Sequence, residues 1–463
     1  MTYGFLSASL AYAVFGLAVL LFERQRTRRS GVDAITIFIA ILFIQCCIPG
    51  IVMYAALPFV DPTAPTGNPV FDKIFQAADL TSALLVLCMT VWFVVFFYVG
   101  CAVGRLALER SRALASRIQS FRLTVMDRRL LVLLVGGLAV TLWSFYLMGD
   151  TLLARYANLI LLRADYEGVE RNVLNSNAFG LTQAWSWLTV IALFAIAERR
   201  GRGGLWLACL ALLIIFALLG VSRRALFLPI LLAYLTVVLH GGTWRGRWIF
   251  AACVPVLLLV AFGKEILGVV AWGGSVESVT GRYPLASVAL RATSDMGITI
   301  VESLGTLKFI HMDLRFGVDH MLSIAQRFPE GMLGLDFHFP ERMVRISTAA
   351  FADSNAQDIP PGLLGQMWLD FGILGPVVWG LMFGLQMSVV TYFFERTERT
   401  RESAAVFVLL VFIVALPLNS GSFDFTFSID IFMVLLGILW CVHLGRRQRS
   451  EVAARAPIGE GAG

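Results

Sequence analysis

The sequence predicts an all-α polytopic integral membrane protein with about eleven transmembrane helices. Hydrophobic residues make up 58% of the 463 positions and charged residues only 15%. A soluble protein of this length needs more charge to cover its surface. The apolar residues also form long uncharged blocks, such as 1–22, 80–104 and 371–394, each close to the roughly 20 residues that cross a hydrocarbon core. The blocks lack the alternation of outer-membrane strands, so each is expected to be a helix.

The chain is expected to form a single membrane domain, 1–463. Its first apolar block has no basic leader and no small-residue cleavage site, so we expect a retained span rather than a cleaved signal. The predicted spans lie at about 3–22, 34–55, 80–103, 130–148, 179–197, 204–221, 225–241, 248–270, 367–393, 404–418 and 427–445.

Basic residues in the connecting segments predict the orientation. The segments that follow the odd-numbered spans carry 23 of the 37 Lys and Arg residues, all near span ends. Short cytoplasmic loops carry such an excess of basic residues, whereas long loops do not count in this rule. The odd-numbered loops and the tail 446–463 are therefore predicted to be cytoplasmic, with the N-terminus outside.

Two longer segments then lie on the outer side. Segment 149–178 carries Arg155, Arg163 and Arg171 at a spacing of eight, which on a helix gives no single tight face and favours a plain basic surface. Segment 271–366, between spans eight and nine, mixes Phe, Leu and Met with charges. It is expected to be ordered, partly helical and packed over the membrane mouth, because loops of this length in a compact domain are usually functional.

The cytoplasmic segments leave no room for a nucleotide-binding domain, since all are short apart from 104–129. The sequence has no Walker loop, no GxGxxG after a strand and no HExxH. An ATP-driven or nucleotide-sugar-using enzyme is therefore disfavoured. The seven cysteines lie in apolar runs without ligand spacing, so they are expected to be apolar fillers and no disulfide framework is predicted.

Arginines supply the first candidate site residues on the outer side. Arg223 and Arg224 separate two apolar runs of about 17 residues, which puts them at the outer end of a helical hairpin near headgroup depth. They either snorkel to the interface and mark span ends, or present a planar, permanently charged fork to a lipid-linked phosphate. Arg282 and Arg291 follow span eight closely and are either solvated loop charges or further phosphate contacts.

Acidic and histidine side chains supply the acid–base candidates. Asp370 is distinctive because it stands near the outer start of an apolar stretch, where an ionisable group is costly and often functional. The alternative is a helix-terminal or ion-pairing role. The histidines lack ligand spacing, so no metal is expected. The candidates are Asp295, Glu302, His320, Asp336, His338, Glu341 and Asp370.

Two segments resemble a known family. Ser222-Arg223-Arg224-Ala225-Leu226 resembles the external SRxAL element of O-antigen polymerases and O-antigen ligases. The stretch 361–375, which reads PGLLGQMWLDFGILG, resembles the L-x-x-x-D/E-x-G-x-x-G start of the span after their large external loop. The order of elements from span six to span eleven fits as well. The ligase branch carries a His-Asn pair about eleven residues before the first glycine of this motif; Pro361-Gly362 stand there instead, which favours the polymerase.

The resemblance implies a Wzy-type, GT-C-like glycosyltransferase of the bacterial inner membrane. Such enzymes join undecaprenyl-pyrophosphate-linked oligosaccharide repeats on the outer face, for O-antigen, lipopolysaccharide, capsule or exopolysaccharide synthesis. Donor and acceptor are both lipid-linked, a chain-length regulator is a further partner, and neither cofactor nor nucleic acid is involved. Guanidinium groups would stabilise charge growing on the pyrophosphate, and a carboxylate or His would take the acceptor proton. The expected catalytic residues are Arg223, Arg291, Asp295 and His338; the expected substrate-binding residues are Arg224, Arg282, Arg342 and Asp370.

Three alternative functions stay open at this stage. One is an O-antigen ligase-type transfer of finished glycan. Another is a flippase or transporter for the same lipid-linked sugars, although such proteins usually have more spans, internal repeats and short external loops. The third is a transferase using polyprenyl-monophosphate sugars, which carries an acidic catalytic pair in its first external loop; here Asp61, Asp72 and Asp79 form no adjacent pair.

Overall fold

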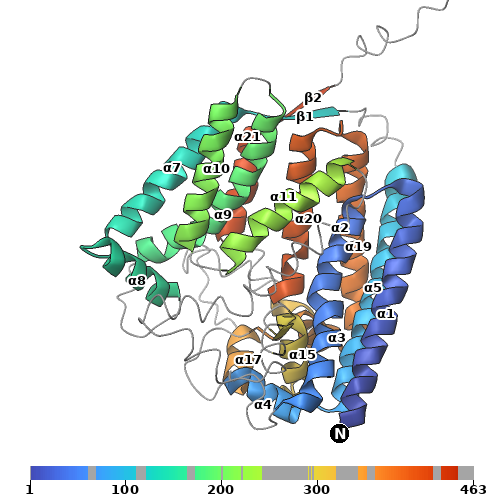
Figure 1. Cartoon of the computed structure of the whole chain (residues 1–463). Helices are drawn as coiled ribbons and strands as arrows, with labels where there is room; N and C mark the ends of the chain where they lie inside the picture. The colour runs from blue at the N-terminus through green and yellow to red at the C-terminus, as the bar shows by residue number, and fades with distance from the viewer. Residues whose placement is uncertain are drawn as a thin grey trace, which may run out of the picture.

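The protein is an elongated bundle of helices with a two-stranded sheet at one end and the N-terminus at the other (Figure 1). We refer to these as the sheet end and the N-terminal end. The computed structural model describes residues 2–60, 69–110, 121–163, 173–199, 202–220, 223–241, 290, 293–294, 297–319, 343–351, 360–420 and 429–446.

Apolar helices account for most of the described residues. Six of them are long and apolar enough to cross a membrane: Gly4–Arg28, Ala34–Phe59, Leu80–Arg110, Asp127–Tyr146, Leu363–Arg396 and Arg401–Leu418. Four shorter apolar stretches in the described part lie at Leu181–Ala197, Gly203–Leu219, Leu228–Gly241 and Ile431–Cys441. These positions agree with ten of the predicted spans, whereas span 248–270 lies outside the described residues. The helices indicate a multi-pass helical membrane protein, and the count of about eleven spans stays a prediction.

Among the described helices, α5 (Leu80–Arg110) and α19 (Gly375–Arg396) pack together most extensively. Glycines make this approach possible, because a Cβ at Gly384 would lie 2.2 Å from the Phe97 carbonyl oxygen. A Cβ at Gly100 would lie 2.5 Å from the Leu381 carbonyl oxygen. Small residues commonly let membrane helices pack this closely, since lipid offers no hydrophobic force to drive them together.

The N-terminal helices pack beside this pair. Helix α1 (Thr2–Ser30) runs parallel to α5, with Gly4 against Leu80 and the Tyr98 hydroxyl donating to Glu23 at 2.5 Å. The predicted span 34–55 is α2 (Ala34–Leu42) and α3 (Ile48–Ala56), joined by a π-helical turn at Phe43–Cys47. At this turn the backbone hydrogen bonds join residues five apart instead of four, so the span is not one regular α-helix.

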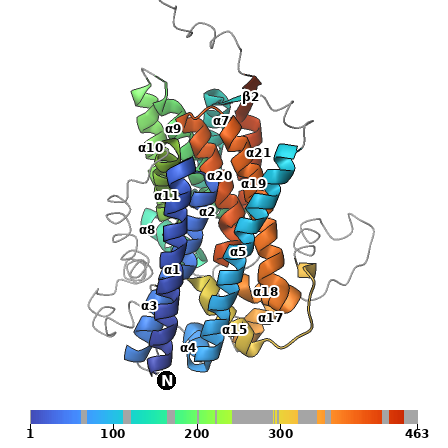
Figure 2. The same ribbon diagram turned by 90° about the vertical axis from the view of Figure 1, so that its right-hand side faces the viewer.

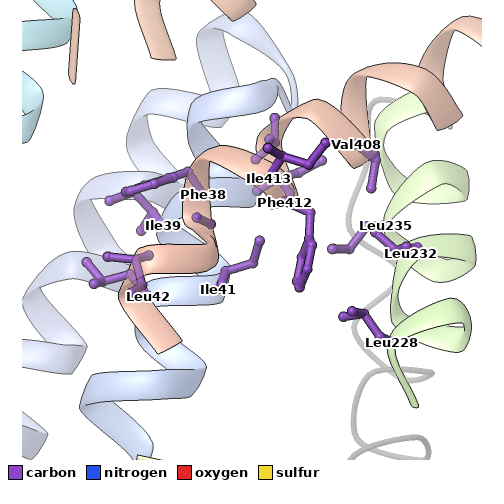
Figure 3. Close-up of a cluster of buried hydrophobic side chains, with 14 of the residues drawn as sticks. Phe38, Ile39, Ile41, Leu42, Leu228, Leu232, Leu235, Val408, Phe412 and Ile413 are labelled. Carbon is purple, nitrogen blue, oxygen red and sulfur yellow. The ribbon is translucent and has the colours of Figure 1, made fainter. Parts of the chain in front are cut away.

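Helix α20 (Arg401–Ser420) joins the two halves of the bundle. It lies between α2 and α11 (Arg223–Gly241), and Figure 3 shows the Phe412 ring between Ile41 of α2 and Leu235 of α11. Helix α9 (Val173–Ala197) packs against α20 and α11, and the remaining apolar helices pack around α9: α7 (Asp127–Tyr146), α10 (Gly203–Gly220) and α21 (Ile429–Cys441).

A short two-stranded sheet accompanies the helices without changing the all-α class. Strands β1 (Phe121–Val125) and β2 (Val442–Arg446) pair antiparallel, with Phe121 opposite Arg446. The prediction that span eleven continues to residue 445 was wrong, because the helix ends at Cys441. An apolar run of this length does not distinguish a helix end from a short strand, whose stability depends on a distant partner.

Several basic side chains at the sheet end form ion pairs. Arg199 and Arg202 both donate to the buried carboxylate of Asp127, and Arg199 also donates to the Val125 carbonyl at 2.7 Å. Glu402 accepts the Val125 amide at 3.0 Å. The segments after predicted spans three, five, nine and eleven therefore meet at one end of the molecule. That this end faces the cytoplasm stays a prediction.

A second ion-pair group joins α1 to α2 near the same end. Arg26 donates to both oxygens of Asp33, at 2.6 and 2.7 Å, and to both oxygens of Glu23, each at 2.9 Å. Burial raises the pKa of Asp33, but the hydrogen bonds and charge of Arg26 and the Thr36 amide outweigh it, so this pKa lies below its usual value. The charge pairing fixes the turn between the first two spans.

Four helices gather at the N-terminal end: α4 (Pro69–Ala77), α15 (Ile298–Phe309), α17 (Met343–Phe351) and α18 (Leu363–Phe371) (Figure 2). Three of them fall at least partly within the predicted external segment 271–366. Helix α15 is buried all round, with every residue from Thr299 to Thr306 inaccessible to solvent. A helix this completely enclosed is an interior element of the domain rather than a linker.

Candidate functional site

Eight residues were predicted to form the site, and the structure describes three of them. Asp370 is described in full, whereas Arg223 and Arg224 are described by their backbone as the first two residues of α11. The other five lie outside the described residues and their roles stay predictions: Arg282, Arg291, Asp295, His338 and Arg342.

The segment containing Asp370 begins with a glycine pressed against α15. Gly362 has a φ of +73°, a conformation that favours glycine. A Cβ at this position would lie 2.5 Å from the Thr299 carbonyl oxygen and 2.6 Å from the Ser303 hydroxyl. The chain therefore enters α18 by a path that leaves no space for a side chain.

Hydroxyl groups of α15 cap the start of α18. The Leu363 amide donates to the Thr299 hydroxyl at 2.8 Å and the Gly365 amide donates to the Ser303 hydroxyl at 2.9 Å. The first amides of a helix lack intrahelical acceptors. The side chain of the N-cap residue, which directly precedes the helix in the sequence, usually accepts hydrogen bonds from them. Here a neighbouring helix does so, which fixes α18 on α15.

Asp370 lies at the other end of α18 and is 0% exposed. Its Oδ1 accepts from the Gly317 amide at 3.2 Å and from Gln366 Nε2 at 3.1 Å, and its Oδ2 accepts from Trp379 Nε1 at 3.2 Å. A buried carboxylate needs such donors to offset the loss of water. These contacts tie a turn, α18 and α19 together, which fits the helix-terminal alternative; direct contact with a substrate stays a prediction.

A tight turn closes the same end of α18. The Arg315 amide donates to the Leu369 carbonyl at 2.9 Å, and the Phe316 amide donates to the Asp370 carbonyl at 3.0 Å. The turn needs positive φ at two consecutive residues, 50° at Phe316 and 74° at Gly317. A bulky residue in this conformation is unusual and persists only where its surroundings impose it.

An ion pair completes what we call the Asp370 cluster: Arg315, Asp319, Gln366, Asp370 and Trp379. Arg315 binds Asp319 through two parallel hydrogen bonds of 2.6 and 2.7 Å. Their side chains are only 12% and 11% exposed, so this forked pair is well shielded from water.

The sequence prediction missed four members of the Asp370 cluster. The available signal was spacing, since Arg315 and Asp319 are four residues apart, as are Gln366 and Asp370. Residues at this spacing face each other on a helical turn. The distance of more than 45 residues between the two pairs in the chain, and the turn that joins them, left no local signal.

The backbone of Arg223 and Arg224 lies far from the sheet end. Helix α10 begins beside Arg202, which binds Asp127 next to β1. It has 18 residues, so it carries the chain about 27 Å away before α11 starts. The start of α11, at Arg223 and Arg224, is therefore on the opposite side of the bundle from the sheet end.

Aromatic side chains mark the level of this corner. Trp143 and Tyr146, near the end of α7, are 60% and 59% exposed, as is typical of residues at a membrane–water interface. Helix α8 (Leu152–Arg163) follows them, and its Tyr156 hydroxyl donates to the Leu218 carbonyl near the end of α10 at 3.3 Å. Because α11 starts three residues after α10 ends, Arg223 belongs to the same layer.

Arg155 of α8 lies in this layer too. Its guanidinium carbon is 4.5 Å from the centre of the Tyr146 ring, and its Nε donates to the Gly149 carbonyl at 2.5 Å. The prediction of a plain basic surface is thus incomplete for Arg155, because the cation–π contact holds its charge at the aromatic belt. Fixed positive charge at this depth suits an anionic lipid headgroup.

Two further acidic residues singled out from the sequence are described near α15. Glu302 is 1% exposed within that helix. Asp79 accepts a hydrogen bond from Lys308 at 2.6 Å, which, with the Ser82 amide, lowers the pKa of Asp79 to about 2. His320, Asp336 and Glu341 lie outside the described residues. Within the described ranges, no group of His, Cys, Asp and Glu side chains is arranged to hold a metal ion.

The helices thus define the class, a multi-pass helical membrane protein with a buried polar cluster at the N-terminal end. Comparison with models of protein families, with curated proteins and with solved structures found no match. The family assignment accordingly remains a resemblance carried by two short segments, and the activity it implies is a proposal.

Proposed function

We propose that the chain is a GT-C-like glycosyltransferase that polymerises undecaprenyl-pyrophosphate-linked oligosaccharide repeats on the outer face of the bacterial inner membrane. The observation that carries this proposal is the position of Arg223 and Arg224. They begin a helix in the layer of Trp143 and Tyr146, about 27 Å from the arginine-rich sheet end. Arginines at this end oppose the usual charge bias of membrane proteins, so their position supports a functional role.

Charge is the physical basis of the proposal. Breaking the donor's bond from the anomeric carbon to oxygen leaves both electrons, and hence the new negative charge, on the lipid pyrophosphate. Two guanidinium groups stabilise that charge best where water is scarce. The positive end of the α11 dipole adds to their effect.

The acceptor end of the reaction needs a base. The hydroxyl of the second lipid-linked glycan attacks the anomeric carbon, a glycosidic bond forms, and the hydroxyl proton passes to a side chain. Asp295 and His338 are the proposed bases, and Arg291 is the proposed third charge on the leaving group. Arg282 and Arg342 are proposed to hold the donor. The pyrophosphate leaves by itself, so the reaction requires neither nucleotide nor cofactor.

The Asp370 cluster is proposed to position the substrate-binding segment. Its hydrogen bonds fix the end of α18 against α19, and the hydroxyls of α15 fix the beginning of α18. Rigid support of this kind keeps reacting groups within the narrow limits that catalysis requires. In this proposal Asp370 aligns the external helices. Its direct contact with the glycan, which the resemblance implies, is a separate part of the proposal.

The test is the glycan profile of cells that carry Arg223→Ala as their only copy. We expect the polymer ladder to collapse to one lipid-linked repeat, with Arg223→Lys restoring part of it because charge returns without the fork. The matched control is Arg24→Ala, an exposed arginine near the sheet end, which should leave the ladder intact.

Other outcomes would replace the proposal. A normal ladder in Arg223→Ala at normal protein level removes this arginine from the mechanism. A normal ladder without surface attachment in a deletion strain indicates a ligase. Accumulation of lipid-linked repeats on the inner leaflet indicates a flippase.

A further inference from the structure

The segment that follows α15 alternates between apolar and charged or polar residues. Figure 2 shows this segment leaving α15 and running along the outside of the bundle. At odd positions stand His311, Asp313, Arg315, Gly317 and Asp319. The apolar side chains at even positions are all exposed: Met312 by 38%, Leu314 by 46%, Phe316 by 68% and Val318 by 42%.

A second apolar element continues this surface. The turn at Gly372–Leu374, between α18 and α19, exposes Ile373 by 74% and Leu374 by 60%. The rings of Phe316 and Phe371 meet edge to face at 6.2 Å. A Cβ at Gly372 would lie 3.8 Å from Leu314, so the two elements touch. We call this surface the apolar ledge: Met312, Leu314, Phe316, Val318, Ile373 and Leu374.

The apolar ledge is held rigidly. Backbone hydrogen bonds join Arg315 to Leu369 and Phe316 to Asp370. Beside Phe316 and Val318 the charged neighbours turn inward, since Arg315 and Asp319 bind each other in a shielded pair, whereas His311 and Asp313 at the start of the segment are exposed. Phe316, whose φ is positive, exposes 68% of its surface. A soluble surface would instead turn the charges out and the rings in, so the arrangement indicates an apolar medium outside.

The length of α19 gives the level of the apolar ledge. This helix has 22 residues, about 33 Å, and the hydrocarbon core is about 30 Å thick. Its far end, at the sheet end, carries Arg396 over the Tyr392 ring at 3.5 Å, as expected near an interface. The turn at Gly372–Leu374 therefore lies at the opposite boundary of the hydrocarbon.

The lipid-facing side of α19 runs directly into the apolar ledge. Met382, Leu385 and Val389 are exposed at helical spacing, which forms a stripe along one face. Between Leu374 and Met382, half-buried Val378 lies four residues from each, so the exposed apolar band continues from the turn into this stripe. Continuity with this stripe favours lipid, rather than a second protein surface, as the occupant.

We propose that the apolar ledge is inserted into the bilayer at the boundary between headgroups and hydrocarbon, in the leaflet at the N-terminal end. The ledge then sets the depth of the Asp370 cluster, which is bound to its inner side. This role follows from the exposed apolar surface and the length of α19, and does not require that the protein be a polymerase.

The test is the reaction of single introduced cysteines with maleimides, in the full-length protein reconstituted in liposomes with reagent on both sides. The parent carries Cys88→Ala, because Cys88 is exposed. Phe316→Cys and Ile373→Cys probe the apolar ledge, and Asp313→Cys is the matched control on the same segment. We expect a charged maleimide to modify the ledge positions at least about tenfold more slowly than Asp313→Cys, because a charged reagent enters the apolar boundary unfavourably. A lipid-soluble maleimide should modify all three.

Two results would overturn the proposal. Equal rates with the charged reagent would put the ledge in water. Slow modification of the ledge positions by both reagents, with full modification after unfolding in detergent, would show that protein covers it, either another segment or a second copy. Leu314→Cys gives an independent position if Phe316→Cys does not fold.

Discussion

Gly362 combines a positive φ with close contacts to α15, and replacing it with alanine tests how α15 and α18 fit together. The φ of +73° strains any residue with a Cβ, by about 1–3 kcal/mol. The new methyl group would also lie within 2.7 Å of three α15 atoms: the Thr299 carbonyl oxygen, the Ser303 hydroxyl and the Ser303 amide. Overpacking of this kind costs about 1–3 kcal/mol. A single backbone shift at residue 362 would relieve part of both the φ strain and the steric overlap, so the two costs do not add fully. We therefore expect the free energy of unfolding to fall by on the order of 3 kcal/mol.

The loss would be measured as the change in the free energy of unfolding, from SDS titration in mixed micelles followed by circular dichroism. Gly136→Ala is the matched control, because Gly136 lies in α7 with nothing within 4 Å of its Cβ position. Alanine there should be neutral or stabilise α7 by up to about 1 kcal/mol. If Gly362→Ala were as stable as Gly136→Ala, the close approach of α18 to α15 would be refuted, and with it the support of the Asp370 cluster.

Two further outcomes follow from the same end of the molecule. Asp79→Asn should lower the free energy of unfolding by less than about 1 kcal/mol at neutral pH, because the pair with Lys308 is exposed to water. The folded pKa of Asp79, about 2, lies below the unfolded value. The ion pair thus contributes fully above pH ~4 and its contribution is lost as the pH falls toward 2. A constant difference between the two proteins from pH 7 to pH 2 would contradict this pairing. Asp370→Asn should destabilise by about 1–3 kcal/mol, since it sets an NH2 group against an N–H donor, whereas exposed Asp313→Asn should change nothing; equal stabilities would show that the hydrogen bonds of Asp370 contribute little.

Long apolar blocks were predictable because hydrophobic length is a property of the chain alone. The predicted span 80–103 lies within α5, which continues to Arg110. The extra turns contain charged residues. Arg105 binds Glu109 on the helix surface at 2.9 Å, and ion pairs at this spacing stabilise a helix. Hydrophobicity thus located the span, and the continuation depended on charge pairing beyond the apolar block.

The breaks within spans were not predictable in this way. The predicted span 367–393 is interrupted at Gly372–Leu374, and 34–55 contains a π-helical turn. Both places remain apolar in sequence, so hydrophobicity has no discontinuity there. The first break depends on the 315–317 turn reaching the end of α18, a contact between segments more than 50 residues apart.

The arginine excess had a structural use that counting did not reveal. Arg26 binds Glu23 and Asp33, and Arg199 binds Asp127. The rule for orientation concerns charge during insertion, whereas these pairs form in the folded protein. The count of basic residues predicted which loops lie at the same end. The buried acidic partners of these arginines explain why the same side chains also stabilise that end.

The pairing of β1 with β2 bears on how the chain matures. Strand β1 leads into α7, yet its partner is translated only after α21, so its backbone groups wait through most of synthesis. An unpaired strand exposes backbone N–H and C=O groups that can pair with a non-native strand. During that time Arg199 can hold the Val125 carbonyl, and Glu402 joins it on the Val125 amide only shortly before β2 is made. The sheet therefore forms late in synthesis. A chain that ends before Val442 would contain all the described helices but would leave β1 unpaired.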